Sequence, residues 1–179
     1  MILRIEGSGY QTIKLDNLSD SCQRGVRNGL RLAQAGSQKV LYTDHLLAGL
    51  LALYTESNIF LARQGLSYDA LIERGFKLPE RNIFKADSKD EEFQDVEISS
   101  FCASDLHSAI RAAERLEVAT VEPEYILASN LRRPQAADVV YLLQQLGIDP
   151  GELNNKLEHY IERESKRKIR LAPAIITPN

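Results

Sequence analysis

The chain has 179 residues, of which 44% are hydrophobic and 26% charged, enough for one sizeable core or two small linked cores. Its net charge of −3 argues against wholesale nucleic-acid binding, which usually shows a basic excess. No apolar run approaches the roughly 18 residues of a membrane-spanning helix, and the N-terminus lacks a signal-peptide pattern. We therefore expect a protein of the cytoplasm, or of an organelle stroma after import.

Residues 1–16 differ from everything that follows. Two short β-prone runs, ILRI and YQTIKL, flank the sequence EGSG. This pattern predicts a small hairpin or an extended N-terminal arm. The glycines do not form a phosphate loop, because the Gly-x-x-x-x-Gly-Lys-Ser/Thr pattern is missing.

From Leu18 onward the apolar residues recur with the period of an α-helix. Ser19 or Asp20 is suited to cap this first helix, and Gly36 is suited to end it. Two glycines inside it each cost roughly 1 kcal/mol relative to alanine. The residues that carry the period are Leu18, Cys22, Val26, Leu30 and Ala33, and the two glycines are Gly25 and Gly29.

Seven further helices are predicted, with a charged linker at residues 76–97. Within the linker, residues 82–86 are a candidate strand that pairs with the N-terminal arm. We expect residues 168–179 to form a tail, whose last nine residues, LAPAIITPN, leave the helical body. The predicted helices span 43–54 with Thr43 as N-cap, Ser57 or Asn58 to Gly65, 67–75, about 100–117, 123–131, 135–146, and 150–167 with Asp149 as N-cap.

The two helical stretches can be aligned on each other. An offset of 80 residues matches the first helix of each half, including Cys22 with Cys102, and also places Asp44 opposite Glu124. An offset of 82 then pairs Gly65 with Gly147. We infer an internal duplication: an all-α fold of two four-helix repeats, 17–75 and 98–167, that are related by a pseudo-twofold and pack as one domain.

The first repeat resembles the repeat at the N-terminus of the Clp/Hsp100 ATPases. The family reads Thr-Glu-His-Leu-Leu-x-Gly-Leu where residues 43–50 read TDHLLAGL. The family's Leu-Gly-aliphatic helix end is matched at residues 146–148, and more loosely by Gln64-Gly65-Leu66. The second repeat is degenerate, with Pro123-Glu124-Tyr125 in place of Thr-Glu-His. The resemblance covers residues 18–165 and implies a free-standing or excised Clp N-terminal domain, since the chain has no Walker A sequence.

That resemblance implies a non-catalytic module that binds proteins, peptides or adaptors in a Clp-type chaperone–protease system. The alternative is an ATPase-free accessory subunit that assembles or regulates a Clp protease core. Its partners would be protein substrates or adaptors, with a Clp ATPase or protease core as a further partner, and neither nucleic acid nor a membrane. Peptides would lie in apolar grooves between helices, with acids on the rim that select positive groups.

No motif indicates catalysis, a metal site or a cofactor. The three histidines are far apart, no Gly-x-Ser-x-Gly elbow is present, and Cys22 and Cys102 are expected to be small buried apolar residues. For Asp44 and Glu124 two interpretations remain. Each acid could simply complement the dipole of a helix N-terminus. The family resemblance implies instead that they bind cationic or phosphorylated-arginine groups. In that case Asp44, His45, Glu124 and Tyr125 would be the residues that contact the peptide or partner.

Overall fold

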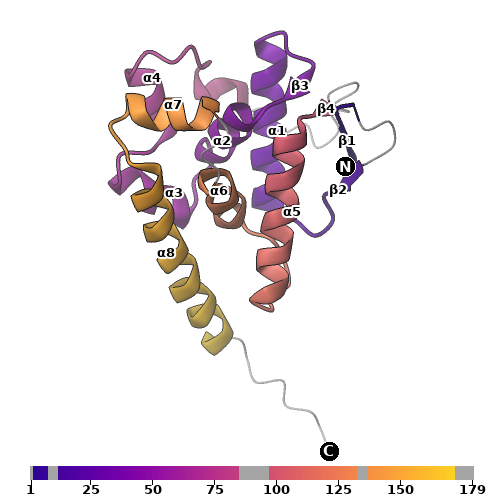
Figure 1. The fold of residues 1–179 in the computed structure, drawn as a ribbon, viewed down its shortest axis with the longest axis vertical. Helices are drawn as coiled ribbons and strands as arrows, with labels where there is room; N and C mark the ends of the chain where they lie inside the picture. The colour runs from indigo at the N-terminus through magenta and orange to yellow at the C-terminus, as the bar shows by residue number, and fades with distance from the viewer. Residues whose placement is uncertain (1, 8–11, 85–96, 133–136, 172–179) are drawn as a thin grey trace, which may run out of the picture.

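The computed structural model of the chain describes residues 2–7, 12–84, 97–132 and 137–171, and within them each repeat contributes four α-helices. A 3₁₀ helix, η1 (Arg81–Phe84), lies between the repeats. The first repeat holds α1 (Asp20–Ala35), α2 (Thr43–Leu51), α3 (Glu56–Arg63) and α4 (Tyr68–Glu73). The second holds α5 (Ser100–Arg115), α6 (Pro123–Leu131), α7 (Ala137–Gln145) and α8 (Pro150–Leu171). The body is all-α, as predicted, with α2 and α6 packed together at its centre (Figure 1).

A small sheet lies at one side of the helices, in the strand order β2-β1-β4-β3 (Figure 1). Strands β1 (Ile2–Ile5) and β2 (Thr12–Lys14) form the antiparallel hairpin of the N-terminal arm. Both β1 and β3 (Val40–Leu41) pair in parallel with β4 (Glu97–Ile98). The prediction that residues 82–86 pair with the arm was wrong. Residues 82–84 belong to η1, while 85 and 86 lie outside the described residues. Ile83 and Phe84 both pack on the core from this 3₁₀ helix.

Backbone contacts between the repeats follow the 80-residue offset. The amide of Ser19 donates to the carbonyl of Val121 at 3.0 Å, and its counterpart Ser99 donates to the carbonyl of Leu41, also at 3.0 Å. Each serine in turn caps its helix, because its Oγ accepts from the amide of Cys22 or Cys102 at 3.2 Å. Each repeat thus donates and accepts the same backbone hydrogen bond with the other, and this reciprocal pattern establishes the pseudo-twofold.

Several helix ends differ from the predicted ones. The N-cap of α2 is Tyr42, not Thr43, and no side chain caps it. Thr43 is the first helical residue and is buried, so its side chain serves packing. The third helix begins at Glu56 with Thr55 as its N-cap, earlier than predicted. The predicted cap of α8 is confirmed, since Oδ1 of Asp149 accepts from the amide of Glu152 at 2.6 Å.

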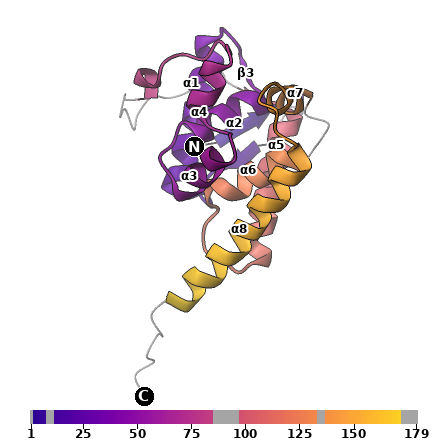
Figure 2. The ribbon, with the colours of Figure 1, turned by 90° about the vertical axis from the view of Figure 1, so that its left-hand side faces the viewer.

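Helix α8 is longer than predicted and reaches Leu171, so residues 168–171 of the predicted tail are helical. The remaining tail residues, 172–179, lie outside the described residues. Leu153, Leu157 and Ile161 form one buried face along this helix, which packs on α6. Figures 1 and 2 show its C-terminal turns projecting beyond the other helices.

Glycines bring α1 and α2 into backbone contact. A Cβ atom added to Gly49 would lie 2.3 Å from the amide nitrogen of Gly29 and 2.6 Å from the carbonyl oxygen of Gly25. No side chain fits in that space. The cost of placing Gly25 and Gly29 inside α1 is therefore offset by an approach that alanine would prevent.

Candidate functional site

The predicted acids both occupy the second position of a short central helix, but their surroundings differ. At the start of α2, Oδ1 of Asp44 accepts from the amide of His45 at 2.8 Å and lies 3.3 Å from that residue's Nδ1. The Asp44 side chain is 40% exposed, whereas that of His45 is only 18% exposed. The exposed ring of Tyr42 lies nearby, with its centroid 6.3 Å from that of His45. This carboxylate is therefore open to a ligand.

At the start of α6 the matching pair is covered. Glu124 and Tyr125 are both buried, and the hydroxyl of Tyr125 lies 3.0 Å from Oγ of Ser165 on α8. Burial, aided by the nearby Glu124 carboxylate, raises the pKa of Tyr160 on α8 to about 12. Helix α8 has extended past its counterpart α4 and lies over this helix start. The two acids are thus equivalent in sequence but not in access.

Each acid faces the first helix of the other repeat. Burial raises the pKa of Cys22 on α1, and the Glu122 and Glu124 carboxylates add to the effect. Burial likewise raises the pKa of Cys102 on α5, with a smaller contribution from Asp44. Both thiols stay protonated at neutral pH, so neither is activated as a nucleophile.

A cavity of about 250 Å³ lies between α5, α6 and α8. Its apolar wall is formed by alanine, leucine and isoleucine side chains, and two arginines and two glutamates lie around them. Of the four residues predicted to bind a partner, only Tyr125 lines it; Asp44, His45 and Glu124 do not. The lining residues are Ala112, Arg115, Leu116, Tyr125, Ala128, Ser129, Arg132, Glu158, Ile161 and Glu162.

The charges of the cavity are partly fixed. Oε1 of Glu158 accepts from Nε of Arg132 at 2.8 Å and from Nδ2 of Asn154 at 2.7 Å. Partial burial opposes ionisation of Glu158, but these two hydrogen bonds outweigh it and lower its pKa. Glu162 and Arg115 are exposed, and the Arg115 Nε donates to the carbonyl of Arg111. The cavity therefore offers an apolar wall with one exposed carboxylate, that of Glu162, and one exposed guanidinium, that of Arg115, beside it.

Sequence reasoning missed this cavity because it depends on the separation of two helices. The 80-residue offset places Asp105, Ala109 and Ser129 where repeat 1 has three close-packed glycines. Asp105 is buried and accepts from Nδ2 of Asn130 at 3.1 Å, and Ser129 lines the cavity. The contact between α5 and α6 is accordingly less extensive than that between α1 and α2. The loss of those glycines was the available signal.

Among the described residues, no group of three or more His, Cys, Asp or Glu side chains is placed to hold a metal ion. In the same part of the chain, no single helix is both long and apolar enough to cross a membrane.

No protein-family model and no curated protein sequence matches the chain. Solved structures do match it. The N-terminal domain of the caseinolytic protease associated chaperone ClpD from Arabidopsis thaliana superposes with a TM-score of 0.64 at 19% identity, covering 87% of this chain and 99% of that domain. The Hsp104 N-terminal domain from Candida albicans gives 0.58 at 14% identity, with 79% and 89% covered. A chain from a malarial protein secretion system gives 0.56 at 14% identity, with 82% and 96% covered. This chain therefore has the fold of a Clp/Hsp100 N-terminal domain, as its internal repeat predicted.

Proposed function

We propose that the chain is a non-catalytic module that binds proteins, peptides or an adaptor in a Clp-type chaperone–protease system. The fold supports this class of function, because the solved domains it resembles belong to such chaperones. Fold alone does not determine function, so the proposal rests on the site.

The observation that carries the proposal is the cavity between α5, α6 and α8. Its volume of about 250 Å³ suits one or two side chains of a peptide rather than a whole cofactor. Burying an aliphatic side chain against Leu116 and Ile161 contributes roughly 1.5–3 kcal/mol. The exposed Glu162 and Arg115 beside this wall favour a peptide in which charged residues flank the apolar one.

Filling the cavity tests the proposal directly. The Ala128→Leu variant adds volume to the cavity wall, and we expect its affinity for fluorescein-labelled β-casein to fall by at least ~10-fold, the equivalent of one lost apolar contact. The matched control is Ala62→Leu, which adds the same atoms at an exposed position of α3. Fluorescence anisotropy measures the casein affinity of both variants. Equal affinity of the two variants, or no casein binding by the wild-type chain, would contradict the proposal.

A second candidate function, an accessory subunit that docks on a Clp peptidase core, is favoured by the N-terminal hairpin. This hairpin lies outside the repeats, is anchored on β4, and leaves β2 at the edge of the sheet. Edge strands accept a further strand from a partner. Copurification with a peptidase core that is lost when residues 1–16 are removed distinguishes this candidate from the first.

A further inference from the structure

Residues 76–84, which follow α4 and include η1, form a segment that we call the strap. Its apolar side chains Phe76, Leu78, Ile83 and Phe84 are half-buried and pack on the core. From Lys77 to Phe84, the backbone hydrogen bonds within the described residues stay inside the strap, apart from one accepted by Pro79. Side chains therefore hold the strap in place, unlike the helices around it.

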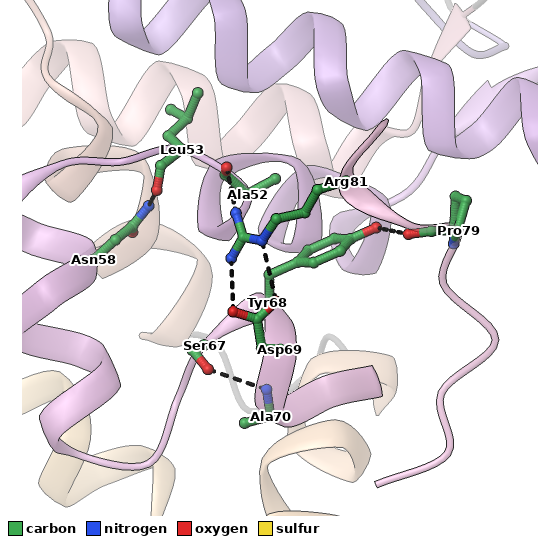
Figure 3. Close-up of polar contacts among 9 residues, drawn as sticks. All are labelled: Ala52, Leu53, Asn58, Ser67, Tyr68, Asp69, Ala70, Pro79 and Arg81. Atoms are coloured by element: carbon green, nitrogen blue, oxygen red, sulfur yellow. Dashed lines mark hydrogen bonds and ion pairs between the residues drawn. The ribbon is translucent and has the colours of Figure 1, made fainter. Parts of the chain in front are cut away.

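Arg81 makes most of the polar contacts that hold the strap, and Figure 3 shows its guanidinium between Ala52 and Asp69. Nη1 donates to the carbonyl of Ala52 at 2.7 Å, while Nε and Nη2 donate to the two carboxylate oxygens of Asp69 at 3.1 and 3.3 Å. The guanidinium lies 5.0 Å from the ring centroid of Tyr68 and 5.2 Å from that of Tyr54. A bidentate carboxylate combined with aromatic rings is a binding site for arginine in particular.

Tyr68 contributes a second anchor beside the first. Its hydroxyl donates to the carbonyl of Pro79 at 2.7 Å (Figure 3). Its ring also meets that of Phe84 edge-on, with centroids 5.5 Å apart. The strap is thus bound at a backbone carbonyl, an arginine and apolar residues, as a peptide ligand would be.

The strap contacts repeat 1 at a position that corresponds to the open cavity of repeat 2. Ala52, whose carbonyl Arg81 binds, is the counterpart of Arg132, which lines the cavity. Helix α1, on which η1 packs, is the counterpart of α5. Leu32 on α1 is only 3% exposed, whereas its counterpart Ala112 lines the cavity. One repeat is closed by its own chain where the other is open.

We propose that the strap is a built-in ligand of repeat 1. It occupies a cleft that recognises a peptide with an arginine set among apolar residues, and release of Arg81 frees this cleft for a second peptide of that composition. The cleft is formed by the C-terminus of α2, the carboxylate of Asp69 and the rings of Tyr54 and Tyr68. It is separate from the cavity of repeat 2 and does not depend on that cavity's function.

The test adds the strap sequence back as a separate molecule. The probe is a labelled synthetic peptide of residues 76–84, FKLPERNIF, offered to the full chain. We expect Arg81→Ala to bind it at least ~10-fold more tightly than the wild type, whose own strap competes, as measured by fluorescence anisotropy. A peptide with alanine in place of its arginine should bind the variant ~10-fold more weakly, because the charge-assisted hydrogen bonds are lost.

The control is Arg74→Ala, which removes an exposed arginine close to the strap but outside the Arg81 contacts. It should bind the peptide as the wild type does. The proposal is overturned if Arg81→Ala keeps its helical circular dichroism yet binds no more tightly than the wild type, or if both peptides bind that variant equally.

A second variant keeps the idea testable if Arg81→Ala does not fold. Asp69→Asn leaves Arg81 in place but removes its charged partner, whose side chain is 66% exposed. We expect trypsin to cleave after Lys77 and Arg81 about 2- to 5-fold faster than in the wild type, because loss of this partly exposed ion pair makes local opening of the strap easier. Glu73→Gln, an exposed change on the same helix, serves as the control. A cleavage rate of Asp69→Asn equal to that of the wild type would contradict the proposal that Arg81 holds the strap through Asp69.

Discussion

The helix pairs α1–α2 and α5–α6 occupy equivalent places in the two repeats, yet one is closed and the other is open. In repeat 1 the pair touches through backbone atoms, with Gly49 set against Gly25 and Gly29. In repeat 2 the same positions hold Ser129, Asp105 and Ala109, and a cavity opens beside the pair. The loss of these glycines accompanies a looser helix pair, and one of the replacements, Ser129, lines the cavity itself.

The same contrast extends to the segments that follow each fourth helix. After α4 the chain turns at Gly75, which has a φ of +86°, and returns as the strap over its own repeat. After the equivalent point in repeat 2 the chain continues as α8 and covers Glu124 and Tyr125. Duplication therefore preserved the frame of the fold, while the segment after each repeat determined which surfaces stay accessible.

The largest expected effect comes from opening the closed pair. Gly49→Ala should destabilise the chain by about 3 kcal/mol, because the new methyl group would overlap backbone atoms of α1 that cannot move independently. An exposed helix position would respond in the opposite direction, since alanine is favoured over glycine by about 1 kcal/mol. Urea denaturation monitored by circular dichroism gives the free energy of unfolding.

Gly36→Ala provides the matched control for this substitution. Its nearest neighbour would lie 3.5 Å from the added Cβ, an ordinary contact, and its φ of −81° suits any residue. We expect a change below about 0.5 kcal/mol, typical of surface substitutions. A Gly49→Ala protein as stable as the control would mean that the close approach of α1 and α2 does not matter to repeat 1.

Substitutions of Asp44 and Glu124 are expected to have a smaller effect, on the affinity for peptides rather than on stability. Asp44→Asn should reduce the preference for an arginine-containing peptide over the same peptide with citrulline by about 10-fold, the value of one charge-assisted hydrogen bond. Glu124→Gln should leave that preference intact, because Glu124 is only 9% exposed. Isothermal titration calorimetry of both variants with both peptides gives the ratio of the two affinities. Equal losses in the two variants would mean that Glu124 is as accessible to ligands as Asp44.

Much of this architecture could be predicted because its signals are local. The serine cap at Ser19 and the stop at Gly36 are readable within a few residues of the helix they bound, and the 80-residue offset follows from matching such short patterns. The residues that close or open surfaces are not local. Arg81 binds Asp69 and Ala52, which are 12 and 29 residues away, and Arg132 binds Glu158 across 26 residues.

The candidate site was predicted only in part for the same reason. Asp44 and Glu124 were found because a helix start has a recognisable sequence, but their unequal exposure depends on how far α8 extends. Ser165 lies within the predicted last helix, yet its packing against Tyr125 could not be foreseen from either segment alone. Contacts between distant segments, rather than the elements themselves, were the missing information.

The smallest expected effect lies at the edge of the open cavity. Hydrogen bonds from Arg132 and Asn154 lower the folded-state pKa of Glu158, so its ionised form stabilises the fold above the pKa it has when unfolded. That stabilisation is lost as the pH falls through the lower folded-state value. Because the Glu158 and Arg132 side chains are 36% and 55% exposed, solvent screening keeps the contribution below about 1 kcal/mol.

Glu158→Gln should therefore be slightly less stable than the wild type at pH 7, and the difference should shrink in acid. Urea titrations at several pH values measure this difference. A gap that stays constant down to acid pH would mean that the Arg132–Glu158 ion pair does not contribute, and that the open cavity is shaped by its apolar wall alone.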